Sequence, residues 1–266
     1  MDEKKYNNGK VENIPENSTE MSLAIREWSE NYKPLENAIG SCIDNNVPTI
    51  ASCAGHSLMD SAYISMPVNK ENLGKIINIM NSVANIRNTE ICLSYMESQG
   101  TILTVSSDMF HRKSMFNTIE KSTTKTMDIG EAFPNVQDLW NAHKELRLHD
   151  VGHSLEVTNS RFSQRLILRP YSDELSHILD DLKLKKDDYT GCYYKTFISK
   201  KGLKNFYQDM IENVDNVCYR KQSDELTETM QSKNNIRETI EKCHIKPVNL
   251  EEKNGPSHQK DREIEE

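Results

Sequence analysis

VPTIASCAGHSLMDSAYISM, residues 47–66, is the stretch on which the predicted fold depends. The apolar and β-branched residues of 47–51 favour a buried strand. Residues 63–66, YISM, form a second strand-like run, which Pro67 is expected to end because proline cannot donate to a sheet. The pentapeptide SCAGH, residues 52–56, therefore lies at a strand end and in the following loop, where proteins often present functional groups.

The SCAGH turn is the leading candidate for chemistry. Cys53 and His56 are three residues apart around Gly55, which gives the backbone freedom to turn. A thiol beside an imidazole is suited to act as a nucleophile with its base, or to supply two ligands of a metal site. We predict catalytic roles for Cys53 and His56, and binding roles for Ser52, Gly55 and Asp60. The alternative is a buried structural cysteine in an ordinary turn.

This region resembles a loosely defined set of uncharacterised bacterial and phage α/β domains. They carry a Ser-Cys-x-Gly-His turn between two strands, and the resemblance covers roughly residues 25–120. The matching residues are Val47, Thr49, Ser52, Cys53, Gly55, His56, Tyr63, Ile64 and Ser65. Asn46 stands where the set often has glycine, and the set implies no activity. The turn is also similar to the Ser-Cys-Ser-Gly turn of wybutosine-synthesising tRNA methyltransferases, from which Ala54 and His56 depart.

Composition narrows the classes of function. The 266 residues include 33 Lys and Arg against 41 Asp and Glu, a net charge of −8, which argues against a nucleic-acid partner. No apolar run approaches the ~18 residues of a membrane span, and the N-terminus lacks a secretory core. Six cysteines without regular spacing are typical of reduced thiols. We expect a cytoplasmic protein with a small-molecule or protein partner and no membrane partner.

The order of predicted elements indicates an α+β fold. Helix-strand-strand units occur twice before residue 123, which favours a two-layer sandwich of a mainly antiparallel sheet with helices on one face. We predict one α+β domain over residues 21–122 and a second α+β region, helical at its C-terminal end, over 134–245. The polar, aperiodic stretches 1–20 and 246–266 are predicted to be disordered tails.

Individual elements follow from hydrophobic periodicity and from capping residues. Helices are expected over 22–28, 34–43, 69–84, 108–119, 136–146, 172–182, 203–211 and 223–243. Further strands are expected over 91–96, 101–105, 155–157, 165–169 and 192–198.

A second candidate site is LHDVGH, residues 148–153, which resembles the His-Asp signature of metal-dependent HD-domain phosphohydrolases. The resemblance implies that His149, Asp150 and His153 hold a divalent metal such as Mn, Fe or Zn, whose ligands these side chains suit. That family is all-helical and uses an upstream histidine, for which His111 is available. The alternative places the pair at an ordinary helix end.

Three functions therefore remain open from the sequence. The first is a small-molecule or metal site at the SCAGH turn, with an unidentified cofactor such as a divalent metal. The second is a non-catalytic interaction or accessory protein in which SCAGH is a structural turn. The third is an HD-like phosphohydrolase. Six basic residues could also form a local phosphate-binding face; they are Arg161, Arg165, Arg169, Lys183, Lys185 and Lys186.

Overall fold

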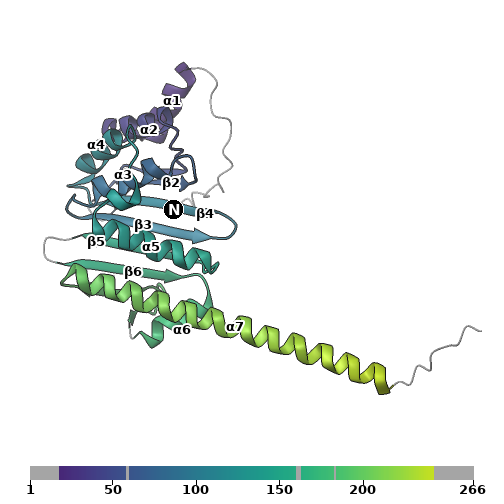
Figure 1. The fold of residues 1–266 in the computed structure, drawn as a ribbon. Coiled ribbons are helices and arrows are strands. Elements are labelled where there is room, and N and C mark those ends of the chain that lie inside the picture. The colour runs from purple at the N-terminus through teal and green to yellow at the C-terminus, as the bar shows by residue number, and fades with distance from the viewer. Residues whose placement is uncertain (1–17, 58–59, 160–162, 183, 243–266) are drawn as a thin grey trace, which may run out of the picture. The chain divides into compact units, whose positions relative to one another are not determined.

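The computed structural model describes residues 18–242, apart from 58–59, 160–162 and 183 (Figure 1). The chain divides into two compact units, Met1–Cys218 and Tyr219–Glu266. The disordered tails predicted for 1–20 and 246–266 lie outside the described residues, except that residues 18–20 begin a helix. None of the described helices combines the length and the apolar character needed to cross a membrane.

The described strands form one eight-stranded sheet in the order β1-β2-β4-β3-β5-β6-β8-β7, with every pair antiparallel. The strands are β1 Ala51–Cys53, β2 Ala62–Val68, β3 Thr89–Met96, β4 Gly100–Ser107, β5 His153–Asn159, β6 Gln164–Pro170, β7 Lys185–Lys186 and β8 Tyr193–Phe197. Because β3 pairs with β5, strands from the two predicted regions share one sheet. The predicted α+β class with a mainly antiparallel sheet is confirmed.

The helices alternate with pairs of strands along the chain. They are α1 Ser18–Trp28, α2 Lys33–Asp44, α3 Leu73–Val83, α4 Arg112–Ser122, the short 3-10 helix η1 Ile129–Glu131, α5 Pro134–Leu148, α6 Asp173–Asp181 and α7 Lys200–Lys242. Proline occupies the first turn of α2 and of α5, where its missing N–H costs nothing. Residues 200–218 of α7 belong to the first unit, and the rest belong to the second.

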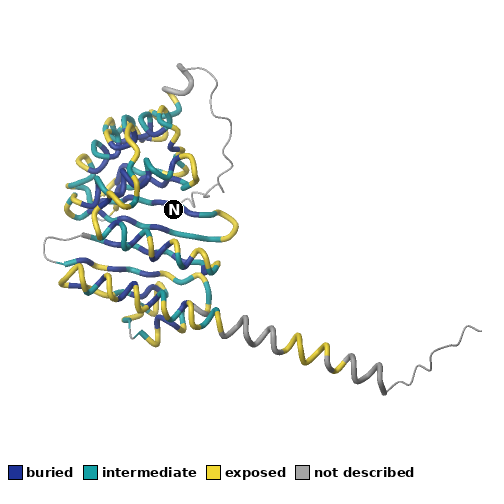
Figure 2. The backbone as a smooth tube through the Cα atoms, in the orientation of Figure 1, coloured by how far each residue is buried: buried dark blue, intermediate teal, exposed yellow. Residues whose placement is uncertain are grey.

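The sheet buries one face and leaves the other accessible. Along β3, Thr89, Ile91 and Leu93 are buried, whereas Glu90 and Cys92 between them are only half-buried. The same alternation runs through the neighbouring strands (Figure 2). Helices α3, α4, α5 and α6 contact the sheet and supply much of the core. We call the other face, which carries Glu90, Cys92 and the residues in register with them, the open face.

The strands around the SCAGH turn differ from the prediction. The first strand occupies 51–53 and not 47–51, so Ser52 and Cys53 are strand residues, while Val47 is buried outside any strand. Pro67 does not end β2, because it pairs in register with Ile102.

Proline is tolerated at this position because of the way in which β2 is paired. The carbonyl of Ser65 accepts a hydrogen bond from Ile50 at 2.9 Å, so this side of Ser65 faces β1. Pro67, two residues further on, directs its nitrogen toward the same side, past the last residue pair between β1 and β2. The missing donor therefore leaves no ladder bond unmade.

Candidate metal centre

The edge of the sheet positions Cys53. Cys53 is the last residue of β1 and lies opposite Tyr63 on β2. The chain then turns through Gly55, whose φ is +73°, a left-handed conformation that favours glycine. A Cβ on Gly55 would lie 3.1 Å from the carbonyl oxygen of Asp60 and 3.2 Å from the nitrogen of Ala62. This close approach brings His56 back beside Cys53.

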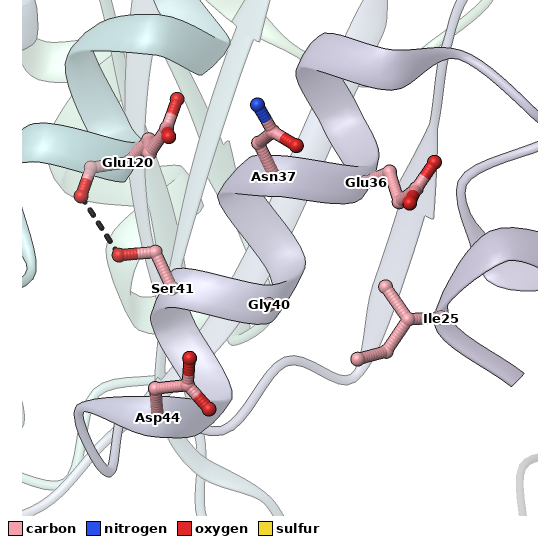
Figure 3. Close-up of a pocket in the computed structure, with 7 residues that line it drawn as sticks. All are labelled: Ile25, Glu36, Asn37, Gly40, Ser41, Asp44 and Glu120. Atoms are coloured by element: carbon pink, nitrogen blue, oxygen red, sulfur yellow. Dashed lines mark hydrogen bonds between the residues drawn. The ribbon is translucent and has the colours of Figure 1, made fainter. Parts of the chain in front are cut away.

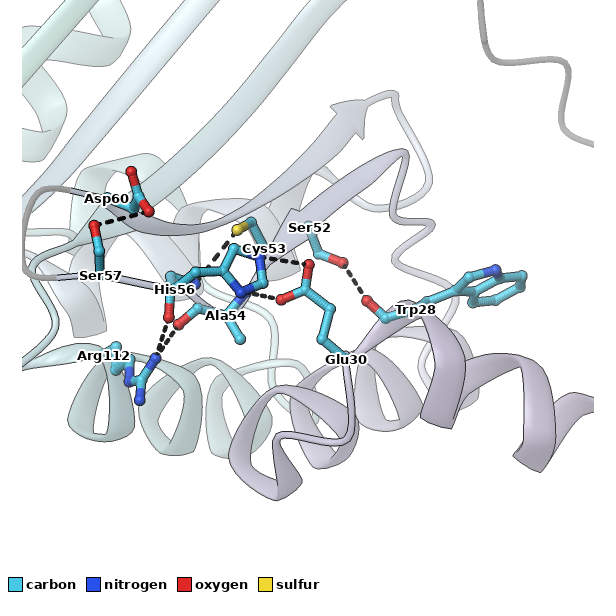
Figure 4. Close-up of polar contacts among 10 residues, drawn as sticks. Trp28, Glu30, Ser52, Cys53, Ala54, His56, Ser57, Asp60 and Arg112 are labelled. Atoms are coloured by element: carbon cyan, nitrogen blue, oxygen red, sulfur yellow. Dashed lines mark hydrogen bonds and ion pairs between the residues drawn. The ribbon is translucent and has the colours of Figure 1, made fainter. Parts of the chain in front are cut away.

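Glu30 completes the site from the turn between α1 and α2. Glu30 and Asn31 both adopt left-handed backbone conformations, with φ of 55° and 60°. The Glu30 Oε2 atom accepts a hydrogen bond from the Ala54 N–H at 3.0 Å, and Oε1 lies 3.2 Å from Nε2 of His56 (Figure 4). One carboxylate therefore contacts both the backbone and the imidazole of the SCAGH turn.

The three side chains converge on one point. The ligand atoms of Glu30, Cys53 and His56 all lie within 4.8 Å of one another. These three side chains could therefore hold a metal ion. The Gly55 N–H donates to Cys53 Sγ at 3.3 Å. The side chains of His56 and Glu30 are 65% and 34% exposed, so an ion can reach them from solvent.

Neighbouring elements hold the turn in place. Nη1 of Arg112, on α4, donates to the carbonyl oxygens of Ala54 and Gly55, at 2.5 Å each. The same guanidinium lies 4.4 Å from the ring centroid of Tyr32, which fixes its orientation. The turn is thus tied to α4 as well as to Glu30, so the backbone that carries Cys53 and His56 is held in place before any ion binds.

The other residues predicted to bind a ligand make internal contacts. Ser52 Oγ donates to the backbone oxygen of Trp28 at 3.2 Å, which links β1 to the end of α1. Asp60 Oδ2 accepts from Ser57 Oγ at 2.9 Å. Both residues support the shape of the turn, and neither belongs to the cluster of three donors.

The residues of the second predicted site point in different directions. Nε2 of His149 lies 2.6 Å from Oδ1 of Asp215 on α7. Asp150 Oδ1 accepts from the Tyr95 hydroxyl at 2.5 Å. His153 opens β5 and is fully buried. The structure therefore does not gather His149, Asp150 and His153 around one ion, because the chain passes from helix to strand within these few residues.

His111, the predicted upstream partner of that site, is also used locally. Its Nδ1 lies 2.7 Å from Oδ1 of Asp108, just before α4. Asp108 in turn accepts from the side-chain amide of Asn88 at 2.8 Å. The histidine is therefore part of the connection between β4 and α4.

A pocket lies between α1, α2 and α4 (Figure 3). It is lined by Ile25, Glu36, Asn37, Gly40, Ser41, Asp44 and Glu120. Ser41 Oγ donates to the Glu120 backbone oxygen at 2.8 Å, which joins α2 to α4. The pocket has acidic side chains without a histidine or cysteine, and carboxylates alone do not define a ligand, so we assign it no role.

No protein-family model, curated protein or solved structure matches the chain. The fold and the site define an α+β protein with a Cys-His-Glu cluster at the edge of an antiparallel sheet. Its function is therefore inferred from the chemistry of that cluster.

Proposed function

We propose that this protein binds a divalent metal ion, zinc in preference to others, through Glu30, Cys53 and His56. The observation that carries the proposal is the convergence of the three ligand atoms within 4.8 Å. Thiolate, imidazole and carboxylate are all established zinc ligands, and the thiolate disfavours the hard cations magnesium and calcium. Of the three donors, the sequence pointed to Cys53 and His56 and missed Glu30.

The geometry is close to what zinc needs. Zinc binds sulfur at about 2.3 Å and nitrogen or oxygen at about 2.0–2.2 Å, in tetrahedral arrangement. Ligand atoms around such an ion are then roughly 3.5 Å apart, close to the 3.2 Å between His56 Nε2 and Glu30 Oε1. To bind an ion, the three ligand atoms, which lie within 4.8 Å of one another, would move slightly closer together.

Three protein ligands leave one coordination position for water or a small molecule. Sites of this kind are typical of catalytic zinc, which activates a bound water or polarises a carbonyl. Glu30, Cys53 and His56 would hold the ion, and Arg112 would keep the turn rigid through its contacts with the two carbonyl oxygens. We therefore infer a metal-dependent reaction on a small molecule as the activity of this site.

Calorimetric titration of the reduced, chelator-treated full chain with zinc tests the proposal. We expect one ion per chain, and each of Cys53→Ser, His56→Ala and Glu30→Gln should weaken binding by at least tenfold, the loss expected for removing a metal ligand or its support. Wild-type protein that takes up no zinc, or three variants that bind it as tightly as wild type, would contradict the assignment.

Cys42→Ala is the matched control for the cysteine variants. Cys42 is fully buried on α2, so its truncation should leave zinc binding unchanged and lower the free energy of unfolding by about 1–2 kcal/mol. Cys53→Ala should abolish zinc binding and leave the free energy of unfolding nearly unchanged, because Cys53 is only half-buried at the end of a strand.

The Glu30–His56 contact also supports a second candidate, a cysteine nucleophile whose base is oriented by a carboxylate. Protein that binds no zinc but whose Cys53 is alkylated rapidly, and slowly in His56→Ala, would favour that candidate. Burial raises the pKa of Cys42 to about 12 and that of Cys92 to about 11, so both serve as unreactive internal standards. A Cys53 as inert as these would favour the interaction-protein hypothesis, in which SCAGH is a structural turn.

A further inference from the structure

The open face of the sheet carries a group of small polar side chains at its centre. The register places hydroxyl and thiol groups side by side across β2, β4, β3 and β5. Ser65 Oγ lies 2.8 Å from Thr104 Oγ1, and Cys92 Sγ lies 3.1 Å from Ser154 Oγ. These short side chains form hydrogen bonds with one another. A second protein surface can therefore pack closely on the face without leaving their polar groups unpaired.

The acidic and the basic residues of this face lie on different strands. Glu90 on β3 and Glu156 on β5 form an acidic strip. Arg165 and Arg169 lie on β6, the next strand, and both are exposed. Ser106 and Thr158 donate to the Glu90 carboxylate at 2.9 and 3.2 Å, so that carboxylate is held in place.

Glu156 is the second carboxylate of the acidic strip. It is half-buried in the middle of the face, and its carboxylate makes no hydrogen bond to the described residues. Burial, and then the nearby charge of Glu90, raise its pKa to about 7, while the charges of Arg165 and Arg169 act to lower it. A carboxylate in this state would be stabilised by cationic donors from a layer placed over the sheet.

We propose that the open face docks against the open face of a second copy of this chain. Glu90 and Glu156 disfavour a polyanion such as RNA, and Arg165 and Arg169 disfavour a purely cationic partner. An identical face carries both signs and is complementary to itself in a two-fold dimer. A two-fold axis parallel to the strands, between β5 and β6, sets Glu156 of each copy over β6 of the other, between Arg165 and Arg169, and sets Glu90 over β8.

The packing of such a dimer is physically reasonable. Two sheets stack face to face at about 10 Å with their strands roughly aligned. Serine, threonine and cysteine side chains fit within that spacing, while the longer glutamate and arginine side chains can reach across it. The interface would bury the open face, which no described element of the chain covers.

Sedimentation equilibrium of the full chain, with a charge-swap pair, tests the proposal. Wild type is expected to be dimeric, and the dimer should dissociate as NaCl approaches 1 M, where the screening length is about 3 Å. The variant Glu90→Lys with Glu156→Lys, and the variant Arg165→Glu with Arg169→Glu, should each raise the dissociation constant by about 100-fold, because like charges then face each other. Mixing the two variants should restore a dimer that contains one chain of each.

Glu36→Lys with Asp44→Lys is the matched control, since it makes the same charge change on α2 and should leave the dimer intact. Circular dichroism and thermal melts establish that each variant is folded. A wild-type chain that stays monomeric at the highest soluble concentration would overturn the proposal. A dimer that persists in both charge-reversed variants would also overturn it. If the variants do not fold, the salt dependence of wild type decides, and a dimer that persists at 1 M NaCl would overturn the proposal.

Discussion

At the scale of single residues, Gly55 should be the most sensitive position of the candidate site. The φ of Gly55 is +73°, and a Cβ there would lie 3.1 Å from the Asp60 carbonyl oxygen. Gly55→Ala therefore combines backbone strain with a steric clash. We expect a loss of about 1–3 kcal/mol in the free energy of unfolding, together with weaker zinc binding. Urea denaturation and a zinc titration measure the two effects.

Gly40→Ala provides the comparison for this prediction. Gly40 lies within α2, and a Cβ there would meet nothing within 4 Å. Alanine is the better helix former, so this variant should gain up to about 1 kcal/mol. Equal effects of the two substitutions would show that the turn does not depend on the left-handed glycine.

Glu30 shows why the residues of the site were only partly predictable. Cys53, Gly55 and His56 are close in sequence, and reactive residue types around a glycine signal a functional turn. Glu30 reaches Ala54 from 24 positions earlier, through the docking of α1 and α2 beside β1. The sequence around Glu30 contains no motif that marks a metal ligand. Only the tertiary structure brings its carboxylate to His56.

At the scale of elements, the docking of α7 has an identifiable weak point. Tyr207 is buried against the core, and its hydroxyl finds no hydrogen-bond partner among the described residues. This burial raises the pKa of Tyr207, with the charge of Asp138 adding to the effect. Tyr207→Phe should therefore raise the free energy of unfolding by about 1 kcal/mol, because it removes a buried hydroxyl that has lost its contact with water and gained no hydrogen bond in return.

Tyr193→Phe is the control with the opposite expected sign. The Tyr193 hydroxyl donates to Asp180 at 2.7 Å and lies 3.3 Å from the Ser176 carbonyl oxygen, so it joins β8 to α6. Its loss should cost about 1–2 kcal/mol. Thermal melts of both variants decide the matter, and a destabilised Tyr207→Phe would mean that this hydroxyl has a partner after all.

Hydrophobic periodicity predicted the central elements well, because their burial is strong and regular. β3 and β4 alternate as expected, and α3 presents its apolar residues at helical spacing. Elements at the edge were harder: the two-residue strand β7 has both residues exposed and no apolar period. Likewise, the first strand was misplaced because Val47 is buried without pairing in the sheet.

At the scale of the molecule, a buried chain of hydrogen bonds links the two halves of the sequence. The Val151 carbonyl can only accept, so His153 Nδ1, 2.6 Å away, carries a proton and donates. His153 Nε2 then accepts from His143 Nδ1 at 2.9 Å, and His143 Nε2 accepts from Thr101 Oγ1 at 3.1 Å. Burial lowers the pKa of both imidazoles, which keeps them neutral at pH 7 and in this arrangement, and they connect α5 to strands β4 and β5.

This pair should make the stability of the fold depend on pH. Burial lowers the pKa of His143 to about 3, with repulsion from His153 in its protonated form adding to the effect, and burial lowers the pKa of His153 to about 4. Unfolded histidine titrates near 6.5, so below that pH the unfolded chain takes up protons that the folded chain refuses. The stabilisation is complete above pH 6.5 and is lost as pH falls toward 4, by roughly 2 kcal/mol per histidine between pH 7 and pH 5.

Glu156 acts in the opposite direction, which determines how the measurement must be made. Its folded pKa of about 7 lies above its ordinary 4.5, so protonation of the folded state adds stability as pH falls between those values. Subtracting the urea-derived unfolding free energies of a His143→Gln, His153→Gln double variant from those of wild type at each pH cancels this contribution. The difference should shrink steadily from pH 7 to pH 5, since only wild type carries the buried imidazoles. A difference that stays constant over this interval would mean that both histidines accept protons without unfolding.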